Sequence, residues 1–469
     1  MDSIEGRHFF TETYIKYGVG ESLLFKFLNY LLQINYTHIG IITSVVYSLN
    51  LVFIYLNVKK LSNSVIAFFF TLTAFLLHSF AIYPWPDYYA GLSLSVACYG
   101  LMDNEKQERI WRPILAGSFL FLAFLFRNTY LLSLSASMCA YLLVTVYFKS
   151  LRSRSLLISI GVFFGLVSSY LSFLFMQGTL SIWFSETIGA GSSQYGIGIR
   201  SVLALLERAF LFSSLTNAIV TLFLYGTVFT VFITVFKPNR FKYLKVINGP
   251  GLIVLFAFFG VSGILQATLG YELFRIQNAC SPIYLVCAFY LGEKFSNLSF
   301  KQIAFELKAI TAILLVSLLM KFPHGSTLWP LYTGKLNSYE KSEIPYYRGH
   351  RFQKSESDYY NGLVKILCAQ NKKIVNITMD SSVPFLCGEN RNVFALPFFN
   401  EQMLARTNLE ALNQIKAGEF AANELIVSSS GIVANAKFRV TELGRVEMPE
   451  TIRFMGPSHP VMVYSVEKR

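Results

Sequence analysis

Charged residues are scarce in this sequence. Asp, Glu, Lys and Arg make up 14% of its 469 residues, whereas about a quarter is usual in soluble proteins. Hydrophobic residues make up 54%, and long apolar runs follow one another between about His38 and Lys321. This composition excludes a disordered chain, a collagen and a lone amphipathic anchor. It predicts an integral membrane protein.

Cysteine and histidine are sparse as well, with six of each. The sequence has no Cys-x-x-Cys pair, no His-Glu-x-x-His motif and no spacing typical of zinc ligands. We therefore expect no metal site and no cofactor, although a divalent ion held by other ligands stays open. A P-loop is missing too, so nothing indicates direct binding of a nucleotide. Residues 1–20 contain no apolar core, and we expect no cleavable signal peptide.

Apolar stretches long enough to cross a bilayer predict about ten transmembrane helices. The run from 113 to 148 would be about 54 Å long as one helix, whereas a hydrocarbon core is about 30 Å thick. We therefore break it at Arg127-Asn128-Thr129, which leaves Arg127 at the membrane edge. The predicted spans are 38–58, 62–82, 87–101, 113–126, 129–148, 155–176, 211–236, 249–269, 276–292 and 305–321.

Positive charge is distributed unevenly between the loops. From His38 to Lys321, fifteen Lys and Arg residues fall in one set of alternate loops and five in the other. Because Lys and Arg are retained on the cytoplasmic side, ten spans with this bias place residues 1–37 and everything after Lys321 outside the cytoplasm. The net charge of +13 is then largely a topology signal and does not indicate nucleic-acid binding. A translocated N-terminus without a helix before it is uncommon, so we expect a further span to precede Met1.

Residues 322–469 are more polar and predict a small α/β domain. Apolar side chains recur at helical spacing from Ser357 to Gln370, and a capping box at Thr407 and Glu410 predicts a second helix that ends near Gly418. Strands are expected at 373–378, 391–396 and 424–428. The protein is then mainly α, with an extracytoplasmic first loop carrying an amphipathic helix, a transmembrane helical domain and an extracytoplasmic α/β domain at 1–37, 38–321 and 322–469.

Cys368 and Cys387 are the two cysteines of this polar region. They could pair outside the cytoplasm, where disulfides persist. Cys368 lies on the apolar face of the predicted helix, which favours a buried thiol over a disulfide. The sequence leaves both arrangements open.

Charged residues at the outer face of the helix bundle are the candidate functional residues, because charge at membrane depth is costly and is usually functional. Asp87 begins a predicted span, and Arg127 lies at a later outer turn. Structural roles compete with functional ones, since an acid favours a helix N-terminus and an arginine can extend to the headgroups. Other candidates are the acids of the first and long outer loops, two further arginines and two aromatic residues that could stack on a sugar or anchor at the interface: Asp2, Glu5, Glu186, Arg200, Arg275, Trp85 and Tyr88.

The order of several motifs resembles a known family. Glu5-Gly6-Arg7-His8 precedes an amphipathic stretch that contains Tyr17-Gly18. Next come Asp87-Tyr-Tyr-Ala-Gly-Leu-Ser-Leu and the string Leu115-Ala-Gly-Ser-Phe-Leu-Phe-Leu-Ala-Phe-Leu-Phe-Arg127-Asn-Thr. Over about residues 1–290 this order is similar to the C-type glycosyltransferases, specifically the bacterial branch akin to protein mannosyltransferases and lipid A aminoarabinose transferases.

The resemblance implies an enzyme of the bacterial inner membrane that takes a sugar from a polyprenyl-phosphate carrier. It would transfer that sugar to a hydroxyl of a lipid, glycan or protein at the outer face. Such a transfer needs a carboxylate to accept the proton of the acceptor and cations to hold the departing phosphate. The resemblance makes Glu5, or Asp2, the candidate base, and Asp87 could orient the acceptor or share that role. Arg127, with Arg200 or Arg275, would bind the carrier phosphate.

Three other functions use the same compartment or carrier. A transporter or flippase for lipid-linked glycans would require inverted repeats or broken helices near the midplane, and the sequence shows no convincing repeat. A polysaccharide polymerase or ligase normally has a large outer loop between spans instead of a C-terminal α/β domain. A non-catalytic assembly partner stays open, because Ile4 stands where the family usually has Asp.

Overall fold

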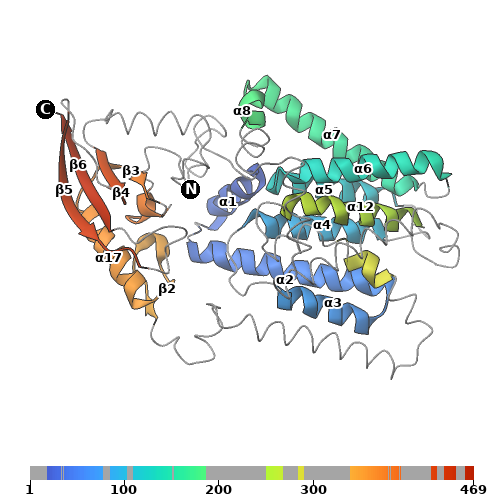
Figure 1. The fold of residues 1–469 in the computed structure, drawn as a ribbon, viewed down its shortest axis with the longest axis horizontal. Coiled ribbons are helices and arrows are strands. Elements are labelled where there is room, and N and C mark those ends of the chain that lie inside the picture. The colour runs from blue at the N-terminus through green and yellow to red at the C-terminus, as the bar shows by residue number, and fades with distance from the viewer. Residues whose placement is uncertain are drawn as a thin grey trace, which may run out of the picture. The chain divides into compact units, whose positions relative to one another are not determined.

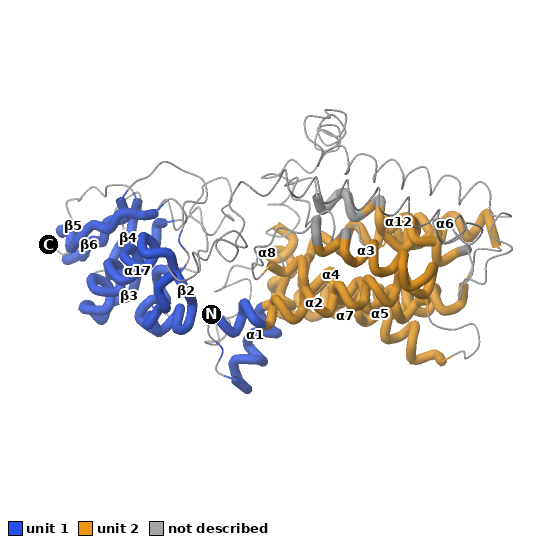
Figure 2. The backbone as a smooth tube through the Cα atoms, turned by 90° about the horizontal axis from the view of Figure 1, so that it is seen from below, with its two compact units in different colours: residues 1–15, 22–41, 330–469 blue, residues 16–21, 42–329 orange. Residues whose placement is uncertain are grey.

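The computed structural model describes the chain in segments. These are residues 18–32, 34, 36–77, 85–102, 109–149, 153–185, 250–267, 282, 284–289, 339–378, 380, 382–389, 391, 424–429, 438–449 and 460–468. The chain divides into two compact units (Figure 2). One unit consists of residues 1–15, 22–41 and 330–469, and the other of residues 16–21 and 42–329.

Among the described residues, three helices are long and apolar enough to cross a membrane. They are α2 (Tyr36–Leu61), α6 (Tyr130–Tyr147) and α7 (Arg154–Met176). Two shorter apolar helices are α5 (Trp111–Phe126) and the segment Gly251–Gly260 of α12 (Pro250–Ala267). The protein is therefore mostly helical and has the apolar helices of a membrane protein (Figure 1).

The other helices also fall where the apolar pattern predicted them. α3 (Ser64–Leu77) and α4 (Pro86–Met102) lie in the predicted spans 62–82 and 87–101, and α1 (Val19–Leu32) lies in the amphipathic stretch before the first span. A short helix, α8 (Leu180–Phe184), follows α7. The predicted spans at 211–236 and 305–321 lie outside the described residues, so the total of ten stays a prediction.

The long apolar run breaks where the thickness of a bilayer requires it. α5 ends at Phe126 and α6 begins at Tyr130, which confirms the predicted break. Arg127 between them has an extended backbone with φ −144° and ψ 105°. The chain stays tightly folded through the break, because Arg127 N donates to Ala123 O at 3.0 Å and Tyr130 N donates to Arg127 O at 2.9 Å.

Small residues bring the helices of this unit close together. α5 packs against both α4 and α7, and α6 packs against α12. A Cβ atom added at Gly117 of α5 would lie only 2.5 Å from the carbonyl oxygen of Ser159 in α7. The Ser159 hydroxyl donates to Pro113 O at 2.8 Å, and the Ser137 hydroxyl of α6 donates to Phe258 O of α12 at 3.2 Å. Such contacts hold helices together where no water drives their association.

The unit that contains residues 330–469 has a four-stranded sheet in the order β3-β4-β6-β5. β3 (Lys373–Ile377) and β4 (Glu424–Ser428) run parallel, whereas β6 (Val461–Lys468) is antiparallel to β4 and to β5 (Phe438–Val446). Helix α17 (Lys354–Leu367) contributes Tyr359, Tyr360, Leu363 and Leu367 to the core beside the sheet. A two-stranded ladder of β1 (Glu340–Lys341) and β2 (Arg351–Phe352) precedes the helix.

Most sequence predictions for this region hold where they can be compared. Strands β3 and β4 confirm the predicted strands at 373–378 and 424–428, but β5 and β6 were not predicted. α17 begins at Lys354, before the predicted start, because Gln353 and Glu356 form a capping box. The predicted strand at 391–396 and the helix from Thr407 lie outside the described residues, apart from Arg391, which is not in a strand.

The preference for a buried thiol at Cys368 is wrong. Cys368 and Cys387 form a disulfide, with their Cα atoms 5.6 Å apart. The helix ends at Leu367, so Cys368 is its C-cap residue and not a member of its interior face. The 3-10 turn η6 (Val383–Phe385) returns the chain and brings Cys387 to the helix end.

The close approach of α5 and α7 gives a direct test of the packing. Replacing Gly117 with Leu forces these two helices apart, and overpacking of this kind typically costs about 1–3 kcal/mol. We expect Gly117→Leu to lower the melting temperature of the purified protein in detergent. Gly165→Leu in α7 is the matched control, because a Cβ atom at Gly165 meets nothing within 4 Å. Equal melting temperatures for the two variants would contradict the close contact between α5 and α7.

Candidate functional site

Asp87 and Arg127 form a buried ion pair at one end of the helical unit. Asp87 lies in the first turn of α4, and Arg127 lies in the link between α5 and α6. Each side chain is only 2% exposed, and Arg127 Nη1 donates to Asp87 Oδ2. Arg127 Nε donates to Thr129 Oγ1 at 3.1 Å. Two residues that are far apart in the sequence thus share one polar site.

Local sequence explains how each member of the pair is presented. Pro86 is compatible with the first helical position, where its missing N–H group is not needed, and an acid next to it interacts favourably with the helix dipole. Arg127 ends the apolar helix α5, and its extended backbone lies outside the helical ladder. Burying either charge alone would be costly, because an isolated ion loses its hydration. The pairing offsets part of that cost.

Aromatic residues flank both members of the ion pair in the sequence and pack against one another. Tyr88 is 1% exposed and its ring meets the edge of Tyr47 at a centroid distance of 5.7 Å. The ring of Tyr89 stacks on Phe126 at 5.3 Å, and its hydroxyl lies 2.8 Å from Thr43 Oγ1. Tyr88, which the sequence nominated for sugar stacking, therefore lies within the packed wall of the site. Trp85 precedes it and is partly buried.

The start of α1 packs directly against the end of α5. A Cβ atom added at Gly18 would lie 2.1 Å from Leu125 O, and one added at Gly20 would lie 2.9 Å from Leu125 C. No side chain fits in this space, so glycine is required at both positions. The contact brings α1 to the residues that immediately precede Arg127, and it gives a physical reason for the Tyr17-Gly18 motif.

Glu21 is a functional candidate that the sequence analysis missed. It lies in the first turn of α1 and is partly buried. Burial, and next the negative charge of Asp87, raise the pKa of Glu21 to about 8. The sequence did contain a signal, because Glu21 directly follows the glycines at positions 18 and 20. An acid in a first helical turn is also common for reasons of the helix dipole alone.

Asn128 is a second candidate that the sequence analysis missed, since it named this residue only as part of the Arg127-Asn-Thr string. Its side chain is buried, with 8% of the residue exposed. None of the described residues accepts a hydrogen bond from its Nδ2 group. Buried donors normally have a partner, so an unpaired amide beside Arg127 is suited to bind an oxygen atom of a ligand.

The remaining nominated residues fall outside the part of the chain that the structure describes. These are Asp2, Glu5, Glu186, Arg200 and Arg275. The structure therefore brings together Asp87 and Arg127 among the charged candidates, with Tyr88 and Trp85 beside them. Within the described residues, His, Cys, Asp and Glu do not form a group of three that could hold a metal ion.

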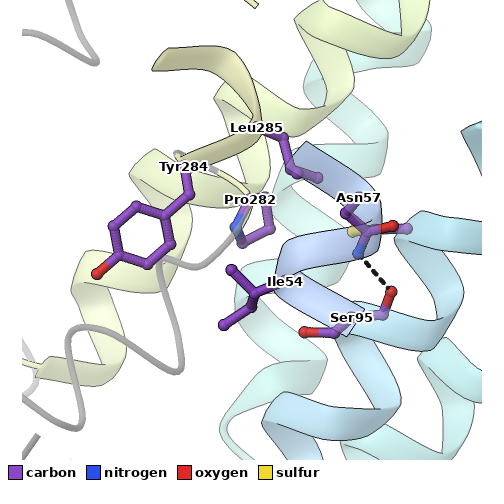
Figure 3. Close-up of a pocket in the computed structure, with 7 residues that line it drawn as sticks. Ile54, Asn57, Ser95, Pro282, Tyr284 and Leu285 are labelled. Atoms are coloured by element: carbon purple, nitrogen blue, oxygen red, sulfur yellow. Dashed lines mark hydrogen bonds between the residues drawn. The ribbon is translucent and has the colours of Figure 1, made fainter. Parts of the chain in front are cut away.

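A second polar contact lies elsewhere in the same unit. Asn57 Nδ2 of α2 donates to Ser95 O of α4 at 2.8 Å, beside a small cavity lined also by Ile54, Pro282 and Tyr284 (Figure 3). The cavity has a volume of about 10 Å³, roughly enough for one water molecule and far too small for a sugar. We therefore assign it no substrate and regard Asp87 and Arg127 as the candidate site.

Comparison of the sequence with models of known protein families finds no match, and comparison with curated proteins finds no similar sequence.

The energetic dependence between Asp87 and Arg127 can be measured with a double-mutant cycle. Removing one partner of a buried pair leaves the other charge uncompensated and typically costs about 3–5 kcal/mol. We expect Asp87→Asn and Arg127→Gln each to lower the melting temperature strongly, and the double variant to lose clearly less than the sum of both. Lys59→Gln, which removes an exposed charge of α2, is the control and should have little effect. Additive losses in the double variant would show that the two side chains do not interact.

Proposed function

We propose that this protein is a membrane glycosyltransferase that moves a sugar from a polyprenyl-phosphate donor to a hydroxyl of a lipid, glycan or protein at the outer face of the membrane. The observation that supports it most is the arginine held by Asp87 at the end of an apolar helix, next to the buried Asn128 Nδ2 group, from which none of the described residues accepts a hydrogen bond. The order of motifs supports the same class.

A phosphate group fits the chemistry of these residues. Guanidinium remains charged at low dielectric and carries five N–H donors in a rigid fork, two of which bind Asp87 and Thr129 here. Asp87 and Thr129 hold the fork in one orientation before any ligand arrives. The Asn128 amide would add a neutral donor to the same phosphate. Preorganised donors of this kind stabilise a departing phosphate more strongly than water does.

The remaining roles follow from the needs of glycosyl transfer. The bond between the sugar and the phosphate breaks with its electron pair on the phosphate oxygen, so cations are needed there. Arg200 or Arg275 would assist Arg127, while Trp85 and Glu186 would line the path of the sugar or the prenyl chain, and Tyr88 would support that wall from within the packed interior. Glu5 and Asp2 stay predictions for the acid that receives the proton, and Asp87 orients Arg127.

Two observations support an extracytoplasmic location of the C-terminal domain. Lys and Arg are concentrated in alternate loops, which places both the first 37 residues and the C-terminal region outside the cytoplasm if the chain has ten spans. Independently, the Cys368–Cys387 disulfide is typical of proteins in an oxidising compartment. We therefore propose the bacterial inner membrane as the site of action, with the C-terminal domain in the periplasm or its equivalent.

Deletion of the gene tests this function in the cell. We expect mass spectrometry of surface glycans, glycolipids and glycoproteins to show the loss of one sugar residue, because no transferase would then use the donor. A plasmid with the parent sequence should restore it. Arg127→Lys should restore far less, because an ammonium group cannot reproduce the fork that binds phosphate.

The matched control is Asn57→Ala, which also removes a buried polar contact but lies at the small cavity instead of the ion pair. It should restore the sugar as the parent does. A deletion strain whose surface glycans lose a whole oligosaccharide, with that oligosaccharide accumulated on its lipid carrier, would instead indicate a flippase. Full restoration by Arg127→Lys would contradict the phosphate role of Arg127.

A further inference from the structure

Glu21 stands next to the proposed site without a role in it. The carboxyl group interacts electrostatically with Asp87, and Tyr89 lies within electrostatic reach of Glu21. Asp87 in turn is bound to Arg127. The three side chains, from α1, α4 and the link after α5, are therefore linked by electrostatic interaction between Glu21 and Asp87 and by the ion pair between Asp87 and Arg127.

The position of Glu21 is fixed by backbone contacts. Gly18 and Gly20 allow the start of α1 to pack against Leu125 and Phe126. A methyl group at either glycine would collide with the backbone of these two residues. Glu21 follows these glycines directly, in the first turn of the helix. It therefore lies beside the end of α5, and the residue is partly exposed.

Asp87 is poorly suited to receive a proton. Its Oδ2 atom already accepts a hydrogen bond from the Arg127 guanidinium. Protonation of Asp87 would remove the counter-charge of that buried guanidinium, which is strongly unfavourable. Glu21 has no such constraint among the contacts that the structure shows, so the two acids have different tasks: Asp87 holds the cation and Glu21 is free to exchange a proton.

We propose that Glu21 is the general base of the transfer reaction, an assignment that rests on the proposed function. In the step, the O–H bond of the acceptor breaks and its proton moves to a carboxylate oxygen of Glu21. The acceptor oxygen forms a bond to the anomeric carbon as the bond from that carbon to the phosphate oxygen breaks. The electron pair stays on the phosphate, which Arg127 holds.

The electrostatics of the cluster suit this task. A general base works best when its pKa lies near the working pH, and burial together with the charge of Asp87 raises the pKa of Glu21 to about 8. Glu21 is therefore partly ionised near neutral pH but far more basic than an ordinary carboxylate. Because only the ionised form accepts a proton, the rate should rise with pH and level off above about 8.

The test uses the full chain in lipid nanodiscs with polyprenyl-phosphate mannose, glucose, galactose and aminoarabinose, and with water or a membrane extract of the host as acceptor. We expect Glu21→Gln to lower kcat by about 10²–10⁴-fold and to remove the rise with pH. Glu21→Asp should restore part of the rate. Lys26→Gln, an exposed substitution on the same helix, should leave both rate and pH profile unchanged.

Infrared spectroscopy provides a measurement that needs no substrate. The carboxyl band of the parent should contain one component that titrates near pH 8 and is missing in Glu21→Gln. In Asp87→Asn, which still carries Glu21, that component should titrate at lower pH, because a neighbouring negative charge is removed. A band that does not change in Glu21→Gln would overturn the assignment.

The outcomes separate the two proposals. If the parent transfers no sugar from any of the donors, the proposed function fails and the role of Glu21 fails with it. If the parent transfers sugar and Glu21→Gln does so equally fast at every pH, only the role of Glu21 is overturned. Loss of transfer in Glu5→Gln with full transfer in Glu21→Gln would identify the base as Glu5.

Discussion

The arrangement of the helical unit depends on one buried ion pair. An arginine that follows sixteen residues of α5, in a chain with few charges, must find a counter-ion or reach water. Asp87 supplies that counter-ion from the start of α4. The pair fixes where α5 must stop relative to α4, and the glycines of α1 fit against the same helix end. Removal of either charge would therefore disturb three elements at once.

Sequence reasoning predicted the helices well, and for a physical reason. The thickness of a bilayer limits the length of an apolar helix, so the run from 113 to 148 required a break, and the polar residues Arg127-Asn128-Thr129 gave its position. The sequence placed Asp87 and Arg127 at one membrane face, but it did not predict the ion pair between them. Glu21 was missed because its position depends on a backbone contact between Gly18 and Leu125, which no local pattern reveals.

The C-terminal sheet shows a different limit of prediction. β5 is mostly solvent-exposed and has an irregularity between Glu442 and Gly444, so its polar and apolar residues do not alternate cleanly. Its place in the sheet is set by pairing with β6, a strand that does not follow it directly in the sequence. The disulfide was misjudged for a related reason, since Cys387 reaches Cys368 only through the turn at η6.

A structure of the protein in lipid nanodiscs, determined by cryo-electron microscopy at side-chain resolution, tests the central claim most directly. Our account predicts that the Arg127 guanidinium contacts the Asp87 carboxylate, with Glu21 on the same side of the helix bundle and within reach of the pair. Density that places Arg127 among lipid headgroups or in solvent, with Asp87 bound only to the backbone of its own helix, would contradict it.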